Sequence, residues 1–113
     1  MCVYPESGCN NYKYLLKFRR GAFISEKPVC PVAVDYNTSM VQWDYGCINN
    51  FDMLTLFLSY GTFTHYLNHF QVFQPNEYLF ETHADKGKER WEIYAWAIRD
   101  IIANASKLEK SEV

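Results

Sequence analysis

The clearest hydrophobic pattern in the chain is a helical one near its end. From about Lys88 to Leu108, apolar residues recur at intervals of three and four positions. This spacing places side chains on one face of an α-helix. The residues are Trp91, Tyr94, Ile98, Ile101, Ile102, Ala105 and Leu108. The pattern predicts an amphipathic helix that turns this face to the core, followed by a charged, frayed tail from Lys107 to Val113.

Three stretches have the patterns of strands. Pro28 to Val34 is apolar without polar alternation, which is typical of a strand buried on both faces of a sheet. After a turn over Asp35 to Thr38, Met40 to Tyr45 alternates between apolar and polar residues, so a second strand is predicted there. His65 to Phe73 is predicted as a third strand, which Pro75 ends.

A second helix is predicted from Phe51 to Tyr60, with Gly61 as its stop. Its apolar face consists of Phe51, Leu54, Phe57 and Leu58. That face suits an ordinary core helix and a helix lying on a membrane surface equally well. The surrounding apolar run, Phe51 to Phe63, is well short of the ~20 residues that a membrane-crossing helix needs.

The beginning of the chain is predicted to contain the end of a strand and a helix. Met1 to Tyr4 resembles the last residues of a buried strand, which Pro5 terminates. Asn11 is a suitable N-cap for a helix over about Tyr12 to Arg20, and Gly21 can end that helix.

Strands and helices thus alternate along the chain, interrupted by an acidic loop predicted over Asn76 to Asp85. This alternation predicts an α/β architecture, and 113 residues support one domain. The composition is 49% hydrophobic and 18% aromatic, which excludes a disordered chain. It also indicates more apolar surface than a small soluble monomer can hide.

Charge is unevenly distributed, although the net charge is only −2. Residues 1–34 carry five basic and two acidic side chains, and the remainder carries six basic and eleven acidic ones. A cationic patch in the first part would suit a phosphate-bearing ligand or an anionic lipid headgroup. The alternative is a solvated surface with an ordinary scatter of charges.

Cysteine and histidine usage does not indicate a disulfide framework or a metal site. The cysteines are Cys2, Cys9, Cys30 and Cys47. They show no Cys-x-x-Cys spacing and follow no secretory signal, so reduced thiols in a cytosol-facing protein are expected. His65 and His69 could share a metal ion only on a helix, and the strand predicted there favours packing or surface roles.

Three motifs in register resemble one protein family. They are Val3-Tyr4-Pro5-Glu6-Ser7-Gly8-Cys9, the basic segment Leu16 to Phe23, and Pro28-Val29-Cys30-Pro31-Val32. Together they are similar to the second half of the lysophospholipid acyltransferase domain. In that family Phe-Pro-Glu-Gly-Thr precedes a Phe-Lys-Lys-Gly-Ala-Phe segment and a Pro-Val-x-Pro-Val strand. The later elements, with Tyr36, Trp43 and Pro75-Asn76, resemble the lysophosphatidylcholine acyltransferase branch most closely, so the resemblance covers residues 3 to about 106.

The resemblance implies a fold and an activity. The fold is the C-terminal half of a glycerolipid acyltransferase-type mixed-sheet domain with flanking helices, over residues 1–106, with residues 107–113 as a charged tail. The activity is transfer of a fatty acyl group from acyl-CoA, as co-substrate, to a lysophospholipid hydroxyl, without a cofactor or metal. The implied partner surface is a membrane and not a nucleic acid, on the cytosolic side of the endoplasmic reticulum or another endomembrane.

The resemblance also implies a substrate-binding site. Its residues are Glu6, Ser7, Gly8, Lys17, Arg19 and Arg20. Glu6 stands where the family's glutamate helps to hold the acceptor headgroup, and the basic residues stand where the family's face phosphate. Ser7 and Gly8 replace the family's Gly-Thr. The glycine is therefore displaced by one position, and a serine at positive φ would be strained.

The family's catalytic His-x4-Asp does not occur in this sequence. The residues five positions after His65, His69 and His83 are Phe70, Gln74 and Lys88. No catalytic residue is therefore expected in this chain, and the chain alone is predicted to be inactive. The alternative is a non-catalytic module that binds lipid, headgroups or another protein. Without the family's preceding strands, an open sheet edge and self-association are expected.

Overall fold

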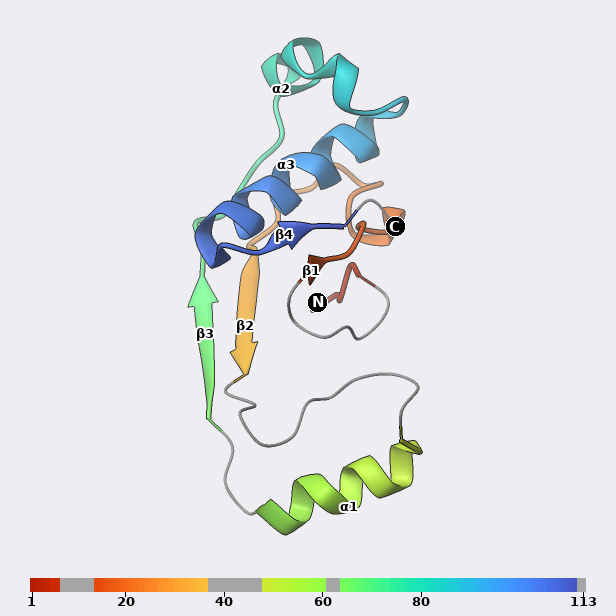
Figure 1. Cartoon of the computed structure of the whole chain (residues 1–113). Coiled ribbons are helices and arrows are strands. Elements are labelled where there is room, and N and C mark those ends of the chain that lie inside the picture. Colours follow the sequence, from red (N-terminus) through yellow and green to blue (C-terminus); the bar gives the residue numbers. More distant parts are fainter. Residues whose placement is uncertain (7–13, 37–47, 61–63, 112–113) are drawn as a thin grey trace.

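The computed structural model describes residues 1–6, 14–36, 48–60 and 64–111. The elements are β1 (Tyr14–Leu15), the 3-10 helix η1 (Arg20–Ala22), β2 (Val32–Tyr36), α1 (Asn50–Tyr60), β3 (His65–His69), α2 (Glu77–Thr82), the 3-10 helix η2 (Ala84–Lys86), α3 (Arg90–Ser106) and β4 (Glu109–Lys110) (Figure 1). The predicted strand Met40 to Tyr45 and the predicted helix stop Gly61 lie outside the described residues.

Helix α3 organises the core and confirms the helix predicted from the hydrophobic pattern. It begins with a capping box, in which Glu89 and Glu92 each accept from the other's backbone N–H. Its buried residues are Ile93, Tyr94, Ala95, Ala97, Ile98, Ile102 and Ala103. Ala105, which belongs to the predicted stripe, is exposed.

Aromatic rings pack against the middle of α3. Tyr94 is fully buried, and its ring meets that of Phe23 edge-on with centroids 5.3 Å apart. Phe23 in turn stacks on Phe18 at 5.9 Å. The Tyr94 hydroxyl donates to the Lys27 carbonyl at 2.9 Å, so the one polar atom of this buried side chain is satisfied. The core therefore joins α3 to the segment around η1.

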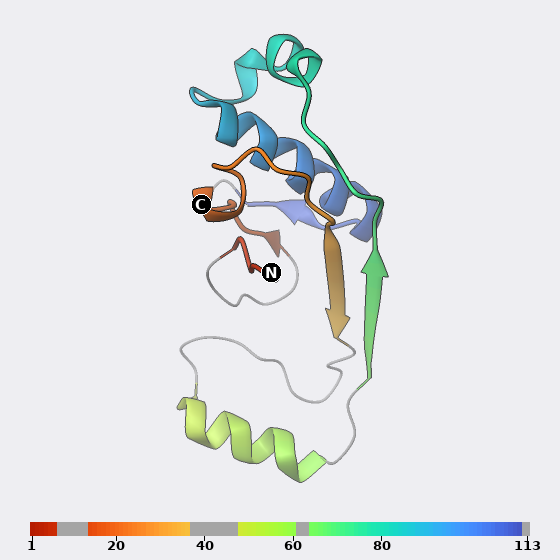
Figure 2. The same cartoon turned by 180° about the vertical axis from the view of Figure 1, so that it is seen from behind.

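The strands within the described residues form two separate two-stranded sheets. β1 and β4 are parallel, with Tyr14 opposite Glu109. β2 and β3 are antiparallel, from Val32 opposite His69 to Tyr36 opposite His65. We call the second sheet the β2–β3 ribbon. Figures 1 and 2 show that the ribbon leaves the core and extends away from α3.

The two strand predictions near the ribbon are confirmed in part. β2 overlaps the predicted strand Pro28 to Val34 only from Val32 onward, and β3 begins at the predicted His65 but ends at His69. The burial predicted for Pro28 to Val34 is wrong, because Cys30 and Val32 are exposed. A strand is buried on both faces only when other layers cover them, and Figure 1 shows the ribbon running away from α2 and α3. Asp35 belongs to β2 and not to a turn.

The predictions for the beginning of the chain are wrong. Tyr14–Leu15 is a strand, the chain is extended at Arg19, and Gly21 lies inside η1, so the helix predicted to end at Arg20 is absent from its described part. Pairing with β4 holds β1 in place and overrides the local helix signal. Met1 to Tyr4 is not a buried strand either, since Tyr4 is 79% exposed.

Two segments predicted to be irregular are ordered. The expected acidic loop contains α2, whose N-cap Asn76 accepts a hydrogen bond from the Leu79 N–H at 2.9 Å. The tail is not frayed over Glu109 to Ser111. β4 pairs with β1, and the Ser111 N–H donates to the Leu15 carbonyl at 3.1 Å.

Helix α1 confirms the predicted helix but not a core position for its apolar face. Phe51 and Leu58 are 74% and 72% exposed, whereas Met53 is buried. The Thr55 hydroxyl donates to the Phe51 carbonyl and that of Ser59 to the Thr55 carbonyl. Both hydroxyls are thus satisfied within the helix. No helix in the described part of the chain is long and apolar enough to cross a membrane.

Candidate functional site

The first residues of the chain lie against the basic segment through two hydrogen bonds. The Glu6 carboxylate accepts from the Leu16 N–H at 2.8 Å, and the Pro5 carbonyl accepts from the Arg19 N–H, also at 2.8 Å. The structure therefore brings together two of the motifs that define the expected substrate-binding site. Ser7 and Gly8 lie outside the described residues.

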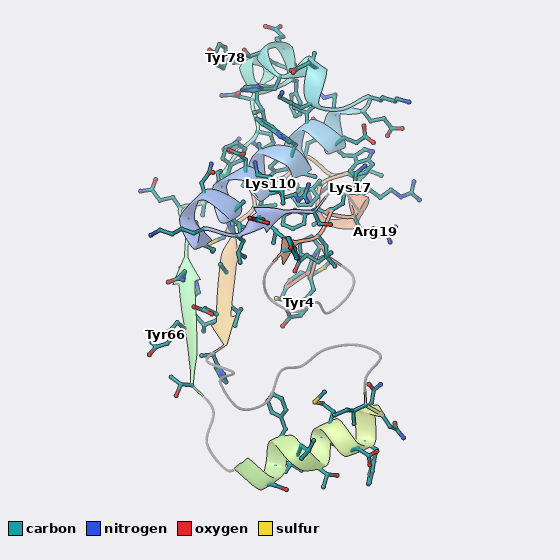
Figure 3. The ribbon with its side chains drawn as sticks, viewed as in Figure 1. Tyr4, Lys17, Arg19, Tyr66, Tyr78 and Lys110 are labelled. Carbon is teal, nitrogen blue, oxygen red and sulfur yellow. The ribbon has the colours of Figure 1, made fainter. Side chains whose placement is uncertain are left out.

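Two cations of the basic segment, Lys17 and Arg19, face solvent because the backbone beside Phe18 is extended at Arg19. Neighbouring side chains of an extended chain point to opposite sides. Phe18 is buried at 4% exposure, so Lys17 and Arg19 on either side of it point outward. Both are exposed (Figure 3). Arg20, at the start of η1, is exposed as well. We call Lys17, Arg19 and Arg20 the basic strip.

Carboxylates of the described residues neutralise little of the positive charge of the basic strip. Within the described ranges, Arg19 and Arg20 form no ion pair. The Lys88 and Glu89 N–H groups that donate to Glu92 lower the pKa of its carboxyl group, and the charge of Lys17 lowers it further by a smaller amount. The guanidinium groups of Arg19 and Arg20 therefore remain able to bind an anion such as a phosphate.

Glu6 is partly buried. Burial raises the pKa of its carboxyl group, and the hydrogen bond from Leu16 and the charge of Arg99 only partly offset this. One carboxylate oxygen already serves the Leu16 N–H. Glu6 therefore has a structural role, because this hydrogen bond holds the first residues of the chain against the basic segment.

Arg99 is a residue of this region that the sequence analysis missed. Its Nη2 donates to the carbonyl oxygens of Leu15, at 2.7 Å, and Ser111. Its Nε is buried without a hydrogen-bond partner among the described residues. Arg99 thus links α3 to β1 and to Ser111, the residue that follows β4. The sequence marks Arg99 only as a single cation that directly follows Ile98 in the apolar stripe. Such cations are too common on helices to identify a functional residue.

The other candidate residues do not gather at this site. His65 and His69 both lie on β3, where four residues span ~13 Å, too far for two imidazoles to share one ion. No cluster in the described part of the chain could hold a metal ion. An open cleft of about 420 Å³ lies between β3 and the end of α3. It is lined by Leu67, Asn68, His69, Phe70, Ala105 and Ser106, so none of the expected site residues contributes to it.

Comparison with known proteins relates the chain to lysophospholipid acyltransferases. It is 51% identical over 37 residues, 33% of its length, to lysophospholipid acyltransferase LPCAT4 of Homo sapiens and of Mus musculus. It is 31% identical over 108 residues, 94% of its length, to lysophosphatidylcholine acyltransferase 2B of Rattus norvegicus. These matches span only 7% and 19% of the relatives' own lengths. No protein-family model and no solved structure matches the chain.

Proposed function

We propose that this chain is the acceptor-binding part of an acyl-CoA-dependent lysophospholipid acyltransferase, with the fold of the C-terminal half of a glycerolipid acyltransferase-type domain. The similarity to lysophosphatidylcholine acyltransferase 2B over 94% of the chain carries this proposal. In this role the basic strip binds the phosphate of the lysophospholipid. Glu6 holds the strip in position through its hydrogen bond to Leu16.

The exposed cations of the basic strip support phosphate binding. A guanidinium offers a planar fork of donors that matches two phosphate oxygens. Arg19 and Arg20 expose two such forks in adjacent positions, and Lys17 adds a third positive charge. An anionic headgroup would be attracted to this strip at physiological ionic strength over distances of about 8 Å.

The chain alone is proposed to be catalytically inactive because its sequence contains no His-x4-Asp. In an assay with purified chain, acyl-CoA and lysophospholipid, we expect no product above the rate without protein. Turnover by the chain alone that Glu6→Ala abolishes would refute this part of the proposal.

Binding can be tested separately from catalysis by vesicle flotation with anionic and with neutral lipids. We expect the chain to float with anionic vesicles in a salt-sensitive manner. The variant Lys17→Gln, Arg19→Gln, Arg20→Gln should lose this binding. A matched control, Lys27→Gln, Lys88→Gln, Lys107→Gln, removes three exposed cations elsewhere and should retain most of it. Equal losses in the two variants would show that net charge alone is responsible.

The alternative function is a non-catalytic module that binds lipid headgroups or another protein. The exposed apolar side chains of α1, Phe51 and Leu58, favour it. Adding the chain to a catalytic acyltransferase half that contains the His-x4-Asp motif distinguishes the two functions. An acceptor-binding part should restore acyl transfer, whereas an independent module should bind vesicles without any effect on turnover.

A further inference from the structure

The outer edge of strand β3 is open to a partner. β3 pairs with β2 on one side, and no strand in the described part of the chain lies on its other side. Leu67 and Tyr66 are 57% and 59% exposed. Figures 1 and 2 show β3 at the outside of the molecule from both directions, and Figure 3 shows Tyr66 pointing away from it. The strand contains no lysine, proline or carboxylate, the residues that commonly protect an edge.

The pairing with β2 determines which backbone groups of β3 face this open edge. The Phe70 N–H donates to the Pro31 carbonyl at 3.0 Å, just before the ladder begins at His69. In an antiparallel ladder every second residue directs its N–H and C=O toward the neighbouring strand. Asn68 and Tyr66 therefore share the inward direction of Phe70. Leu67 lies between them, so its backbone groups face outward.

The sequence of β3 is close to self-complementary. It reads His65-Tyr66-Leu67-Asn68-His69, with leucine in the centre and histidine at each end. If two copies run antiparallel about Leu67, Leu67 opposes Leu67 of the second copy. Tyr66 then opposes Asn68, and His65 opposes His69. This register is two-fold symmetric, as in most homodimers. It brings no carboxylate, lysine or arginine of the strand opposite a like charge.

We propose that two copies of this chain associate through the outer edges of β3, antiparallel and centred on Leu67. The product is a four-stranded sheet in the order β2–β3–β3–β2. The outward backbone groups of Leu67 and the symmetric sequence around it favour a second copy over a lipid or an unrelated protein. A two-stranded ribbon is only marginally stable by itself, so the added strands also stabilise it.

The association is expected to be weak and dependent on concentration. Five residues on each side bury much less area than the standard stable interface. This dimer does not depend on acyl transfer or on the basic strip. The sequence analysis placed an open edge at the beginning of the chain. The edge of β3 is a second such edge, since β1 also has a single neighbouring strand among the described residues.

Disulfide cross-linking tests the register. In a chain whose four cysteines are replaced by serine, Leu67→Cys puts two thiols on facing residues whose Cα atoms are about 5.5 Å apart, which is within disulfide range. We expect cross-linked dimer to form roughly tenfold faster or more than with Leu58→Cys, because pairing raises the local thiol concentration. Leu58, on α1, is the more exposed of the two leucines. Equal rates would overturn the proposal.

Sedimentation equilibrium of the unmodified chain gives an independent test. A monomer–dimer equilibrium is expected. Leu67→Lys should weaken it about tenfold or more, because it loses an apolar contact and opposes two positive charges. Leu58→Lys should leave the dissociation constant unchanged. Both leucines are exposed, so both variants should keep the circular dichroism spectrum of the parent. A monomer at every concentration, or equal weakening by the two variants, would overturn the proposal.

Discussion

The core around α3 and the β2–β3 ribbon contain similar residues, but these are buried in the core and exposed in the ribbon. Tyr94 in α3 is fully buried, whereas Tyr66 in β3 is 59% exposed. Ile98 is buried and Leu67 is exposed. The difference lies in the layers around each element. α3 packs against the η1 segment and Phe80 of α2, whereas no other described helix or strand covers the far end of the ribbon. The apolar content of a segment predicts that it packs against another layer, but it does not show which element forms that layer.

The largest expected effect separates the two regions directly. Tyr94→Ala removes a fully buried ring that contacts Phe23 and Phe73. We expect it to lower the free energy of unfolding by about 3–5 kcal/mol. Leu67→Ala in the ribbon should change it by less than about 0.5 kcal/mol, measured by urea denaturation of the chain at a concentration where it is monomeric.

If Tyr94→Ala prevents folding, the milder variant Tyr94→Phe can be compared with Leu67→Ala in its place. It removes only the hydroxyl that donates to the Lys27 carbonyl, and should cost about 1 kcal/mol. Similar losses for Tyr94→Ala and Leu67→Ala would contradict the distinction between core and ribbon.

Substitution of Arg99 tests whether this side chain of α3 stabilises the parallel sheet of β1 and β4. Arg99→Met keeps much of the side-chain volume but removes the donors to the Leu15 and Ser111 carbonyls. We expect a loss of about 2 kcal/mol and faster amide hydrogen exchange at Ser111. Unchanged exchange would show that β4 pairs with β1 without this side chain.

The N-cap of α2 is expected to have an intermediate effect. Asn76→Ala removes the acceptor for the Leu79 N–H and should cost about 1 kcal/mol in thermal or chemical denaturation. Asn76→Asp keeps an acceptor and is the matched control, with stability close to that of the parent. Equal losses in both variants would argue against capping.

The smallest effect concerns Glu6 and depends on pH. Burial raises the pKa of this carboxyl in the folded chain, so its charged form disfavours folding at neutral pH. Stability of the parent relative to Glu6→Gln should therefore increase as the pH falls below the raised folded pKa toward the ordinary value of 4.5. Denaturation at several pH values measures this. A relative stability that decreases on acidification would contradict the partial burial of Glu6.

The sequence predicted the long elements and missed the short ones for physical reasons. The repeated apolar positions of α3 and the apolar run of α1 are local signals that extend over several turns. β1 and β4 contain two residues each and exist through pairing between distant segments, which no local pattern reveals. α2 is different, because Asn76 followed by Glu77 is a recognisable helix start. Its acidic composition led to the prediction of a loop instead.

The candidate site was predictable in part. The basic strip could be identified from the motif around Lys17, and its exposure follows from the burial of Phe18. The partial burial of Glu6 could not be predicted, because it depends on the Leu16 N–H and on the charge of Arg99. Arg99 is 84 positions from Leu15, the residue whose carbonyl it binds, so only the folded chain brings them together.

The parallel pairing of β1 with β4 has a consequence for synthesis of the protein. Tyr14 pairs with Glu109, so the strand next to the basic strip lacks its partner until the segment around Glu109 has left the ribosome. Contacts of such sequence separation form late and slowly. Until β4 is synthesised, β1 has no strand to pair with beside the basic segment. During that interval the nascent chain is most exposed to aggregation and to binding by chaperones.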